Sequence, residues 1–326
     1  MKAISYSRYG SPGVLKPVEL PKPAPKPGEV LVRIHATSVT SGDYRARSLD
    51  MPPGFGLVGR LVFGLLRPRR KILGTEFAGI VEAVGAAVTR FKPGDRIFAY
   101  PGAAFGGYAE YAVISEEAAI AHVPDNLKLG EAVAISFGGA TALNFLRDKG
   151  GIKSGDRVLV IGASGSGGSA AMQLAKAFGA HVTGTASSGK RDMVGALGAD
   201  AVLDYTSSDP ADETDAYDII LDTSGSATYA KYAAALKPGG RLLLVSSSLW
   251  QILATLLARK TGGRKAIPGY APERAEDLRF LADLAERGDF RPYIDRRFPL
   301  GQAAEAHAWF KNRARKGNVV ITLDTD

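Results

Sequence analysis

The sequence predicts an α/β protein in which a β-rich domain is joined to a doubly wound domain with a parallel sheet. A chain of 326 residues is long enough for about two domains. Up to about residue 122, proline–glycine turns separate short strand-like runs, and from about residue 123 short apolar strands alternate with helical segments. Alternating strands and helices require right-handed crossovers, which place helices on both faces of a parallel sheet.

The first part of the chain is predicted to be mostly strands, at residues 30–37, 78–84, 95–100 and 108–114. The proline-rich residues 20–27 should be extended. Residues 51–66 are glycine-rich and apolar, and they leave two interpretations open. They could form a mobile flap over a pocket or a buried packing segment, and we favour packing because apolar stretches usually belong to a core.

The stretch 157–179 is the strongest signal in the second part. An apolar strand at 157–161 precedes a G-x-x-G-x-x-G turn, and apolar residues at helical spacing follow. Glycines let the backbone approach a pyrophosphate, and the helix N-terminus offers unpaired N–H groups. We therefore predict a dinucleotide site here, with a plain βα turn as the alternative. The predicted contacts are Gly162, Ser164, Gly165, Ser166, Gly167 and Gly168.

The second predicted strand, at 180–185, indicates which dinucleotide binds. A site for NAD usually carries an acidic residue after this strand, but residues 185–191 contain none. Ser187 and Lys190 suit a ribose 2′-phosphate, so we predict NADPH; alternatively, Lys190 and Arg191 only begin a solvated helix. Residues 184–190 also match G-x-x-x-x-G-K, but Arg191 stands where an ATPase needs Ser or Thr for magnesium.

The remaining segments of this part complete the alternation. Strands are predicted at 201–204, 218–222 and 241–246, and helices at 190–197 and 226–236, the latter ended by Pro238-Gly239-Gly240. Residues 249–258 form a second apolar insert, which could be core, a subunit contact or a substrate-pocket wall. Amphipathic helices are expected at 273–287 and 302–315, and a last strand at 318–323 could rejoin the first domain.

Composition excludes several classes of function. Because the chain has no cysteine, it has neither disulfides nor thiolate metal sites. No secretory leader is recognised and no apolar run reaches the ~18 residues of a membrane span, so we expect a cytoplasmic protein without stable membrane insertion. The 41 basic residues exceed the 33 acidic ones, and a basic cluster lies at 67–71. A solvated face or steering of an anionic cofactor explains this excess better than nucleic-acid binding, for which no motif is present.

Three further motifs point to one family. They are KILGTEFAGIVEAVG at 71–85, KPGDRIF at 92–98 and GGYAEY at 106–111. With the glycine turn, they make nearly the whole chain resemble the medium-chain dehydrogenase/reductase superfamily, in its zinc-independent, quinone oxidoreductase-like branch. The resemblance implies a GroES-like β domain at 1–122, completed by 291–326, and a Rossmann-type NADP-binding domain at 123–290. It also implies a homodimer.

The same resemblance implies that no metal is bound. Where the alcohol-dehydrogenase branch has its zinc ligands, this chain has Thr40, Thr75 and Phe137, which cannot replace a Cys/His site. Asp43 matches a residue next to that zinc site, and either a helix-capping or a catalytic role is open to it. The histidines at 35, 122, 181 and 307 fit no ligand spacing and are expected to be structural.

The expected activity follows from these features. Without a metal, hydride from NADPH must go to an acceptor that is already electrophilic, such as a quinone or the C=C of an α,β-unsaturated carbonyl. The two apolar inserts favour a small hydrophobic substrate. Negative charge develops on the carbonyl oxygen of the acceptor, and the resemblance implies that hydrogen-bond donors to this oxygen are Tyr44, Thr40 and Ser41. Tyr44 is the first choice among them, although it could instead be an aromatic wall of the pocket. Further predicted cofactor contacts are Thr141, Tyr205, Ser246, Ser247 and Asn318.

Two other functions remain open at this stage. One is zinc-free carbonyl or alcohol chemistry, and the other is a protein that senses NADPH without turnover.

Overall fold

The computed structural model describes residues 1–257 and 262–323. The chain divides into two compact units. Unit 1 comprises Met1–Met51, Gly56–Phe137 and Glu273–Asp326, and unit 2 comprises Pro52–Phe55 and Gly138–Pro272. The boundaries fall at 137/138 and 272/273, whereas the sequence placed them at 122/123 and 290/291. Helix α8 (Ala275–Glu286) packs against strand β7 (Ile120–His122), which explains why residues after 272 belong to unit 1.

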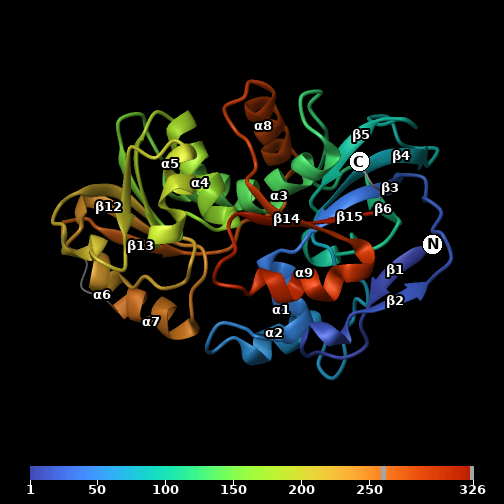
Figure 1. The fold of residues 1–326 in the computed structure, drawn as a ribbon, viewed down its shortest axis with the longest axis horizontal. Helices are drawn as coiled ribbons and strands as arrows, with labels where there is room; N and C mark the ends of the chain where they lie inside the picture. Colours follow the sequence, from blue (N-terminus) through green and yellow to red (C-terminus); the bar gives the residue numbers. More distant parts are fainter. Residues whose placement is uncertain (258–261, 324–326) are drawn as a thin grey trace. The chain divides into compact units, whose positions relative to one another are not determined.

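The strands of unit 1 form an antiparallel hairpin and a mainly antiparallel sheet (Figure 1). The hairpin pairs β1 with β2, and the sheet order within the described residues is β14-β15-β3-β4-β5-β7, with β6 also paired to β3. Besides β7, the strands are β1 (Lys2–Ser5), β2 (Lys16–Glu19), β3 (Glu29–Ser38), β4 (Phe77–Val84), β5 (Arg96–Ala99), β6 (Tyr111–Ser115), β14 (Ile294–Pro299) and β15 (Asn318–Thr322).

The long strand β3 organises this sheet. Val30, Val32 and Ile34 are fully buried in a cluster with Phe77 of β4 and Ile97 of β5. One edge of β3 pairs with β4, and the other pairs with β6 at its start and β15 at its end. The prediction that the C-terminal strand rejoins the first domain is therefore confirmed. Unit 1 also contains α1 (Ser41–Ser48), α2 (Gly56–Phe63), α9 (Ala303–Phe310) and the first part of α3 (Leu129–Leu143).

Unit 2 is a parallel sheet with helices on both faces. Its described strands follow the order β10-β9-β8-β11-β12-β13, and every neighbouring pair is parallel. In Figure 1, α4 and α5 lie on one side of the strands, and α6 and α7 lie on the other. The strands are β8 (Arg157–Ile161), β9 (His181–Ala186), β10 (Ala201–Asp204), β11 (Tyr217–Asp222), β12 (Leu236–Leu244) and β13 (Lys265–Pro268); the helices are α4 (Ser166–Ala177), α5 (Arg191–Ala196), α6 (Tyr229–Tyr232) and α7 (Leu249–Leu257).

This architecture confirms the predicted fold class, a GroES-like β domain with a Rossmann-type parallel sheet. The strand order, counted from β8 along the chain, is 3-2-1-4-5-6, the order of doubly wound dinucleotide-binding domains. Runs buried on both faces, such as Val158 to Val160, explain why these strands show no alternation.

The segment after β11 differs from its prediction. The helix expected at 226–236 is only the short α6, and Pro238-Gly239-Gly240 lies inside β12 instead of ending a helix. Leu236 is fully buried and pairs with Tyr217 of β11, so burial in the sheet outweighs local helix propensity. The short edge strand β13 was not predicted.

The two apolar inserts are also more exposed than expected. The preferred packing interpretation of residues 51–66 is wrong, because most of the large apolar side chains of α2 and of the residues after it face solvent. In α7, Trp250 and Leu253 are exposed, although Leu249 packs against Gly54. Residue 258, at the end of the second insert, lies outside the described residues.

One helix is long and apolar enough to span a membrane, which the apolar runs of the sequence did not indicate. Helix α3 (Leu129–Leu143) continues as a π-helical turn (Asn144–Lys149), giving 21 residues, and an 18-residue apolar window within them has a mean hydropathy of 1.3. However, 89% of the apolar window is buried inside the protein. A core helix has these properties, so the helix is weak evidence for a membrane span.

Candidate cofactor site and catalytic residues

The carboxyl edge of the unit 2 sheet carries the predicted glycine turn. Strands β8 and β11 are neighbours, and the chain order reverses between them. In doubly wound sheets, ligands bind outside the carboxyl ends of the strands at this switch point. Gly162 follows β8 and Thr223 follows β11, and the Thr223 hydroxyl donates to the Ile161 carbonyl at 2.9 Å.

Each glycine of the turn has its own structural requirement. Gly162 has a φ of +80°, which side chains rarely adopt. A Cβ on Gly168 would lie 2.1 Å from the Gly162 carbonyl oxygen, so only glycine lets α4 start this close to β8. At Gly167 the nearest atoms would be 3.9 Å away, which leaves space above the helix start. The predicted residues from Gly162 to Gly168 are thus brought together around the N-terminus of α4, whose first N–H groups have no partner within the helix.

Other predicted contacts lie on the same sheet or beside it. Ser246 and Ser247 follow β12, and the buried Ser247 hydroxyl has no hydrogen-bond partner within the described residues. Such a group is usually satisfied by water or a ligand. Thr141 lies on α3, and Gly138 on the same helix comes so close to α4 that a Cβ would lie 2.9 Å from the Ser166 carbonyl oxygen. The contacts with a cofactor stay predictions.

The loop after β9 corrects one expectation. Ser187 follows β9, as predicted, and precedes a 3₁₀ turn over Ser188–Lys190 that was not predicted. Residues 185–191 contain no acid, but the expectation that no carboxylate lies at this edge is wrong, because Asp204 at the end of β10 accepts a hydrogen bond from the Ser188 hydroxyl at 2.6 Å. Tyr205, the next residue, is exposed.

Asp204 is held in its charged form. The Ser188 hydroxyl and the hydroxyl and N–H of Thr206 donate to it, and they lower its pKa to about 2. Asp204 was not predicted, because acidic residues were expected only after the second strand. The sequence did carry a signal for Asp204, because it ends a predicted strand, and neighbouring parallel strands bring their carboxyl ends to the same edge of the sheet.

In unit 1, the candidates Thr40 and Ser41 lie at the start of α1. Thr40 is the N-cap, and Thr40 and Asp43 form a capping box in which each side chain accepts from the other's backbone N–H. The Asp43 carboxylate also accepts from Gly74 N–H at 2.8 Å and Thr75 N–H at 3.1 Å. The capping interpretation of Asp43 is therefore confirmed, and the Thr40 hydroxyl is engaged in the same cluster.

Tyr44 lies one turn further along α1. Its phenol donates to the Asp50 carboxylate, and its ring stacks on Phe310 of α9 at 6.1 Å between centroids. The Lys311 ammonium lies 4.5 Å from the Tyr44 ring centroid and 3.5 Å from an Asp50 oxygen. The hydrogen bond from Tyr44 lowers the pKa of Asp50, and the interactions of Lys311 with Tyr44 and then with Asp50 raise the pKa of Lys311. Asp50 and Lys311 were not predicted, and only the fold brings Lys311 to this place.

A second buried carboxyl, Glu76, lies close to the capping box. It accepts from the Ser38 hydroxyl and, at 2.6 Å, from the Phe137 N–H. Burial raises the pKa of Glu76 to about 8, although both hydrogen bonds oppose this shift. In the sequence Glu76 stands out only as part of a family motif, and its burial was not predicted.

His307 of α9 is structural, as expected. Its Nδ1 accepts from Arg47 Nε at 3.1 Å, so the proton lies on Nε2, which is 2.9 Å from the Tyr108 hydroxyl. Burial, with a smaller contribution from Arg47, lowers the pKa of His307 to about 3. Asn318, a predicted cofactor contact, is mostly buried and donates from its side chain to the Tyr293 carbonyl at 3.1 Å.

The residues at the former zinc positions do not fit that metal. Thr40 and Thr75 donate to Asp43, and Phe137 has a hydrocarbon side chain that packs on Tyr100. Across residues 1–257 and 262–323, no three His, Asp or Glu side chains converge to hold a metal ion.

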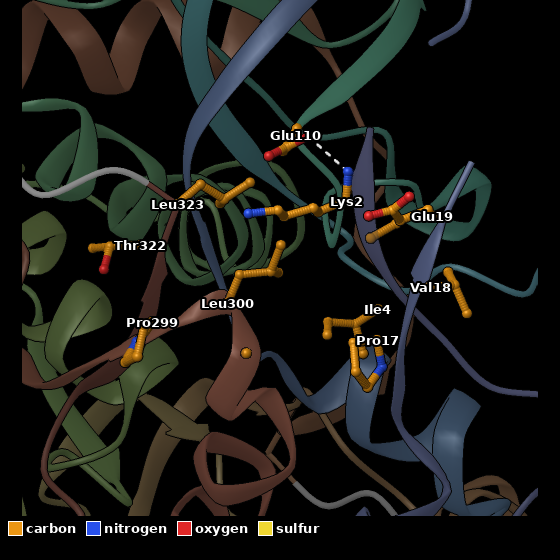
Figure 2. Close-up of a pocket in the computed structure, with 12 residues that line it drawn as sticks. Lys2, Ile4, Pro17, Val18, Glu19, Glu110, Pro299, Leu300, Thr322 and Leu323 are labelled. Carbon is orange, nitrogen blue, oxygen red and sulfur yellow. Dashed lines mark hydrogen bonds between the residues drawn. The ribbon is translucent and has the colours of Figure 1, made fainter. Parts of the chain in front are cut away.

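A separate surface hollow of about 570 Å³ lies in unit 1. It is bounded by β1, β2 and the ends of β14 and β15, and Figure 2 shows the Lys2 side chain reaching toward Leu300 and Leu323. Glu110 accepts from the Lys2 N–H at 2.6 Å at its rim. None of the predicted catalytic or cofactor residues lines this hollow, so it gives no support to the expected chemistry.

Comparisons with known proteins agree with this architecture. The family model of the alcohol dehydrogenase GroES-like domain matches residues 26–125, and that of a zinc-binding dehydrogenase matches residues 197–321. A chloroplastic quinone-oxidoreductase from Triphysaria versicolor is 31% identical over 98% of both chains. A 2-methylene-furan-3-one reductase from Solanum lycopersicum is also 31% identical, over 98% of this chain and 79% of the relative. The solved quinone oxidoreductase from Coxiella burnetii covers 99% of both chains with a TM-score of 0.86 and 29% identity.

The strand order, the glycine turn and these similarities define the fold of the nicotinamide-dependent oxidoreductases. The chain belongs to the medium-chain dehydrogenase/reductase superfamily, in its quinone oxidoreductase-like branch. The predicted family is thus confirmed, and so is a nicotinamide-cofactor domain.

Proposed function

We propose that this protein is a zinc-independent, NADPH-dependent reductase of quinones or of the activated C=C bond of α,β-unsaturated carbonyls. The observation that carries the proposal is the residue set Thr40, Thr75 and Phe137, which offers no zinc site in a chain with a dinucleotide fold. An acceptor that needs no Lewis acid suits such a site, and the names of the relatives point to the same chemistry.

The glycine turn would hold the pyrophosphate of the cofactor, with backbone N–H groups of Ser166, Gly167 and Gly168 as donors. Ser246, Ser247, Thr141, Tyr205 and Asn318 are proposed as further contacts. Bound NADPH supplies a hydride equivalent to the acceptor. The protein would bind the coenzyme and the acceptor, orient them toward each other and exclude water from the site.

Tyr44 is the proposed donor to the oxygen on which negative charge develops. Its one phenol proton is donated to Asp50 in this structure, so the hydroxyl must turn from Asp50 to the substrate oxygen in order to act; the Lys311 ammonium, 4.5 Å from the ring centroid, would favour negative charge there. Thr40 and Ser41 remain weaker candidates, because the Thr40 hydroxyl already serves the capping box. The substitution Tyr44→Phe tests this role.

NADPH rather than NADH is proposed because Lys190 and Arg191 follow β9, where a 2′-phosphate would lie. The Asp204 carboxylate would repel a 2′-phosphate, so the effects of Lys190 and of Asp204 on coenzyme binding must both be tested.

A steady-state screen tests the proposed function. Purified protein is given NADPH with benzoquinones, naphthoquinones, short and long alkyl enones, and matched aldehydes, and loss of NADPH absorbance is followed. We expect turnover with quinones or enones, faster with the longer alkyl chains, and little with aldehydes. Faster turnover of aldehydes would favour carbonyl chemistry, and tight NADPH binding without turnover would favour a sensing role. Elemental analysis that found one zinc per chain would contradict the metal-free site.

The homodimer and the cytoplasmic location stay predictions. Sedimentation equilibrium tests the homodimer, and a measured mass equal to that of one chain would contradict it. Cell fractionation tests the cytoplasmic location.

A further inference from the structure

Helix α2 and the residues after it form an unusual surface in unit 1. Six large apolar side chains within ten residues are between 47% and 84% exposed. We call them the α2 apolar patch, and its members are Leu57, Val58, Leu61, Val62, Leu65 and Leu66. Single exposed leucines are common, but a contiguous group of this kind usually marks an interaction site.

The patch is presented by a fixed helix. Phe63 packs on Phe105 at 6.2 Å between centroids, and the Gly64 carbonyl accepts from the Tyr9 hydroxyl at 2.7 Å. Gly59 is buried against Met51, so close that a Cβ would lie 2.6 Å from that side chain. The inner side of α2 is thus held by Gly59 and Phe63, and the helical period turns the apolar positions outward together.

A cationic stretch accompanies the patch. Residues 56–71 contain no acidic residue and carry five cations, all exposed: Arg60, Arg67, Arg69, Arg70 and Lys71. Arg60 donates to the Leu65 carbonyl at 3.0 Å, which places a guanidinium at the end of the patch. Apolar and cationic side chains are therefore exposed within one stretch of the chain, residues 57–71.

We propose that this surface binds an anionic phospholipid bilayer peripherally. Leucine and valine side chains would enter the boundary between headgroups and acyl chains, while the arginines contact lipid phosphates. At eight residues, α2 is about 12 Å long and cannot span a bilayer core of about 30 Å. Contact of this kind leaves the predicted absence of stable insertion intact.

The charge pattern selects this occupant over others. A second copy of the chain in a two-fold contact would bring the same five cations of each copy together. A nucleic acid would attract the cations but offers no apolar region for six aliphatic side chains. An anionic bilayer satisfies both groups at once, and this proposal is independent of the reaction proposed above.

Vesicle flotation tests the proposal with the full-length protein. Vesicles of phosphatidylcholine with phosphatidylserine are compared with vesicles of phosphatidylcholine alone, at low and high salt. We expect binding to the anionic vesicles only, weakened by salt. The double variant Leu61→Ser/Leu65→Ser should lose binding, and Arg69→Gln/Arg70→Gln should weaken it roughly tenfold or more.

Matched controls separate the patch from general effects. Leu20→Ser changes another exposed leucine of unit 1, and Lys16→Gln/Lys128→Gln removes two exposed cations elsewhere, so both should bind like the unchanged protein. Circular dichroism checks that each variant is folded. Equal binding to neutral vesicles, no binding to either, or unchanged binding of Leu61→Ser/Leu65→Ser overturns the proposal. Self-association that this variant abolishes, without lipid binding, would instead assign the patch to a second copy.

Discussion

At the scale of single residues, the proposed preference for NADPH would depend on opposite charges at one loop. Lys190 and Arg191 follow β9, and Asp204 from β10 reaches the same loop through Ser188. A 2′-phosphate would be attracted by the two cations and repelled by the carboxylate. Selectivity for NADPH therefore requires that the cations dominate.

Two substitutions measure this balance. Lys190→Ala should weaken NADPH binding by about 10- to 100-fold and NADH binding much less, because one charge-assisted hydrogen bond is lost. Asp204→Asn should tighten NADPH binding by up to about fivefold, the size expected for an exposed charge interaction. Fluorescence titration with both coenzymes provides the measurement. If Asp204→Asn instead weakens NADH binding and leaves NADPH unaffected, Asp204 holds a ribose hydroxyl and the NADPH assignment is wrong.

Tyr44 is the second residue whose role can be isolated. Tyr44→Phe keeps the stacking on Phe310 but removes the phenol, so kcat should fall by about 100-fold with little change in KM. Asp50→Asn tests whether the carboxylate positions the phenol, and its kcat should fall less and its pH profile should shift. A fully active Tyr44→Phe enzyme would assign Tyr44 to the pocket wall.

At the scale of elements, α1 depends on a cap that also joins two segments of unit 1. Asp43 serves α1 through Thr40 and holds the backbone of Gly74 and Thr75 just before β4. Burial raises the pKa of Asp43, while these donors oppose the shift. One carboxylate thus fixes the helix that carries Tyr44.

Asp43→Ala should destabilise the protein by about 2 to 4 kcal/mol, because several buried donors lose their acceptor. The matched control is Asp95→Ala, which removes a partly exposed aspartate that accepts from Lys92 N–H, and it should cost less than about 1 kcal/mol. Urea unfolding gives both values. Equal losses would show that the capping cluster has no special importance.

At the scale of the whole molecule, two buried groups make stability depend on pH in opposite directions. Burial raises the pKa of Glu76 to about 8, so the folded state favours the protonated carboxyl. This contribution to stability is complete below the pKa of the unfolded chain, and it is lost as pH rises through 8. His307 has a pKa lowered to about 3, so its buried neutral ring lowers stability as pH falls below the unfolded value of 6.5. Between about pH 4.5 and 6.5 the two effects oppose each other.

The window from about pH 6.5 to 8 isolates Glu76. There the unfolding free energy should fall with rising pH by up to about 1.4 kcal/mol per pH unit for this group, since the unfolded carboxyl is already ionised. Glu76→Gln should remove that contribution, whereas His307→Gln should leave it in place. The same pH slope in Glu76→Gln and the unchanged protein would contradict the raised pKa.

The sequence alone determined the family, the fold class and the glycine turn. These features rest on local patterns, such as the apolar run at 157–161 and glycines whose spacing the turn requires. Local periodicity failed where tertiary contacts compete with it, as at Leu236, which is buried in β12 instead of ending a helix.

Only the tertiary structure decided which distant side chains meet. It brought Asp204 to Ser188, Lys311 to Tyr44 and Glu76 into a buried position, and it left α2 exposed although its composition is that of a core segment. The physical reason is that burial and pairing are properties of the packed chain. A residue's type fixes what chemistry it can do, but its neighbours in space fix its charge state and its exposure to solvent.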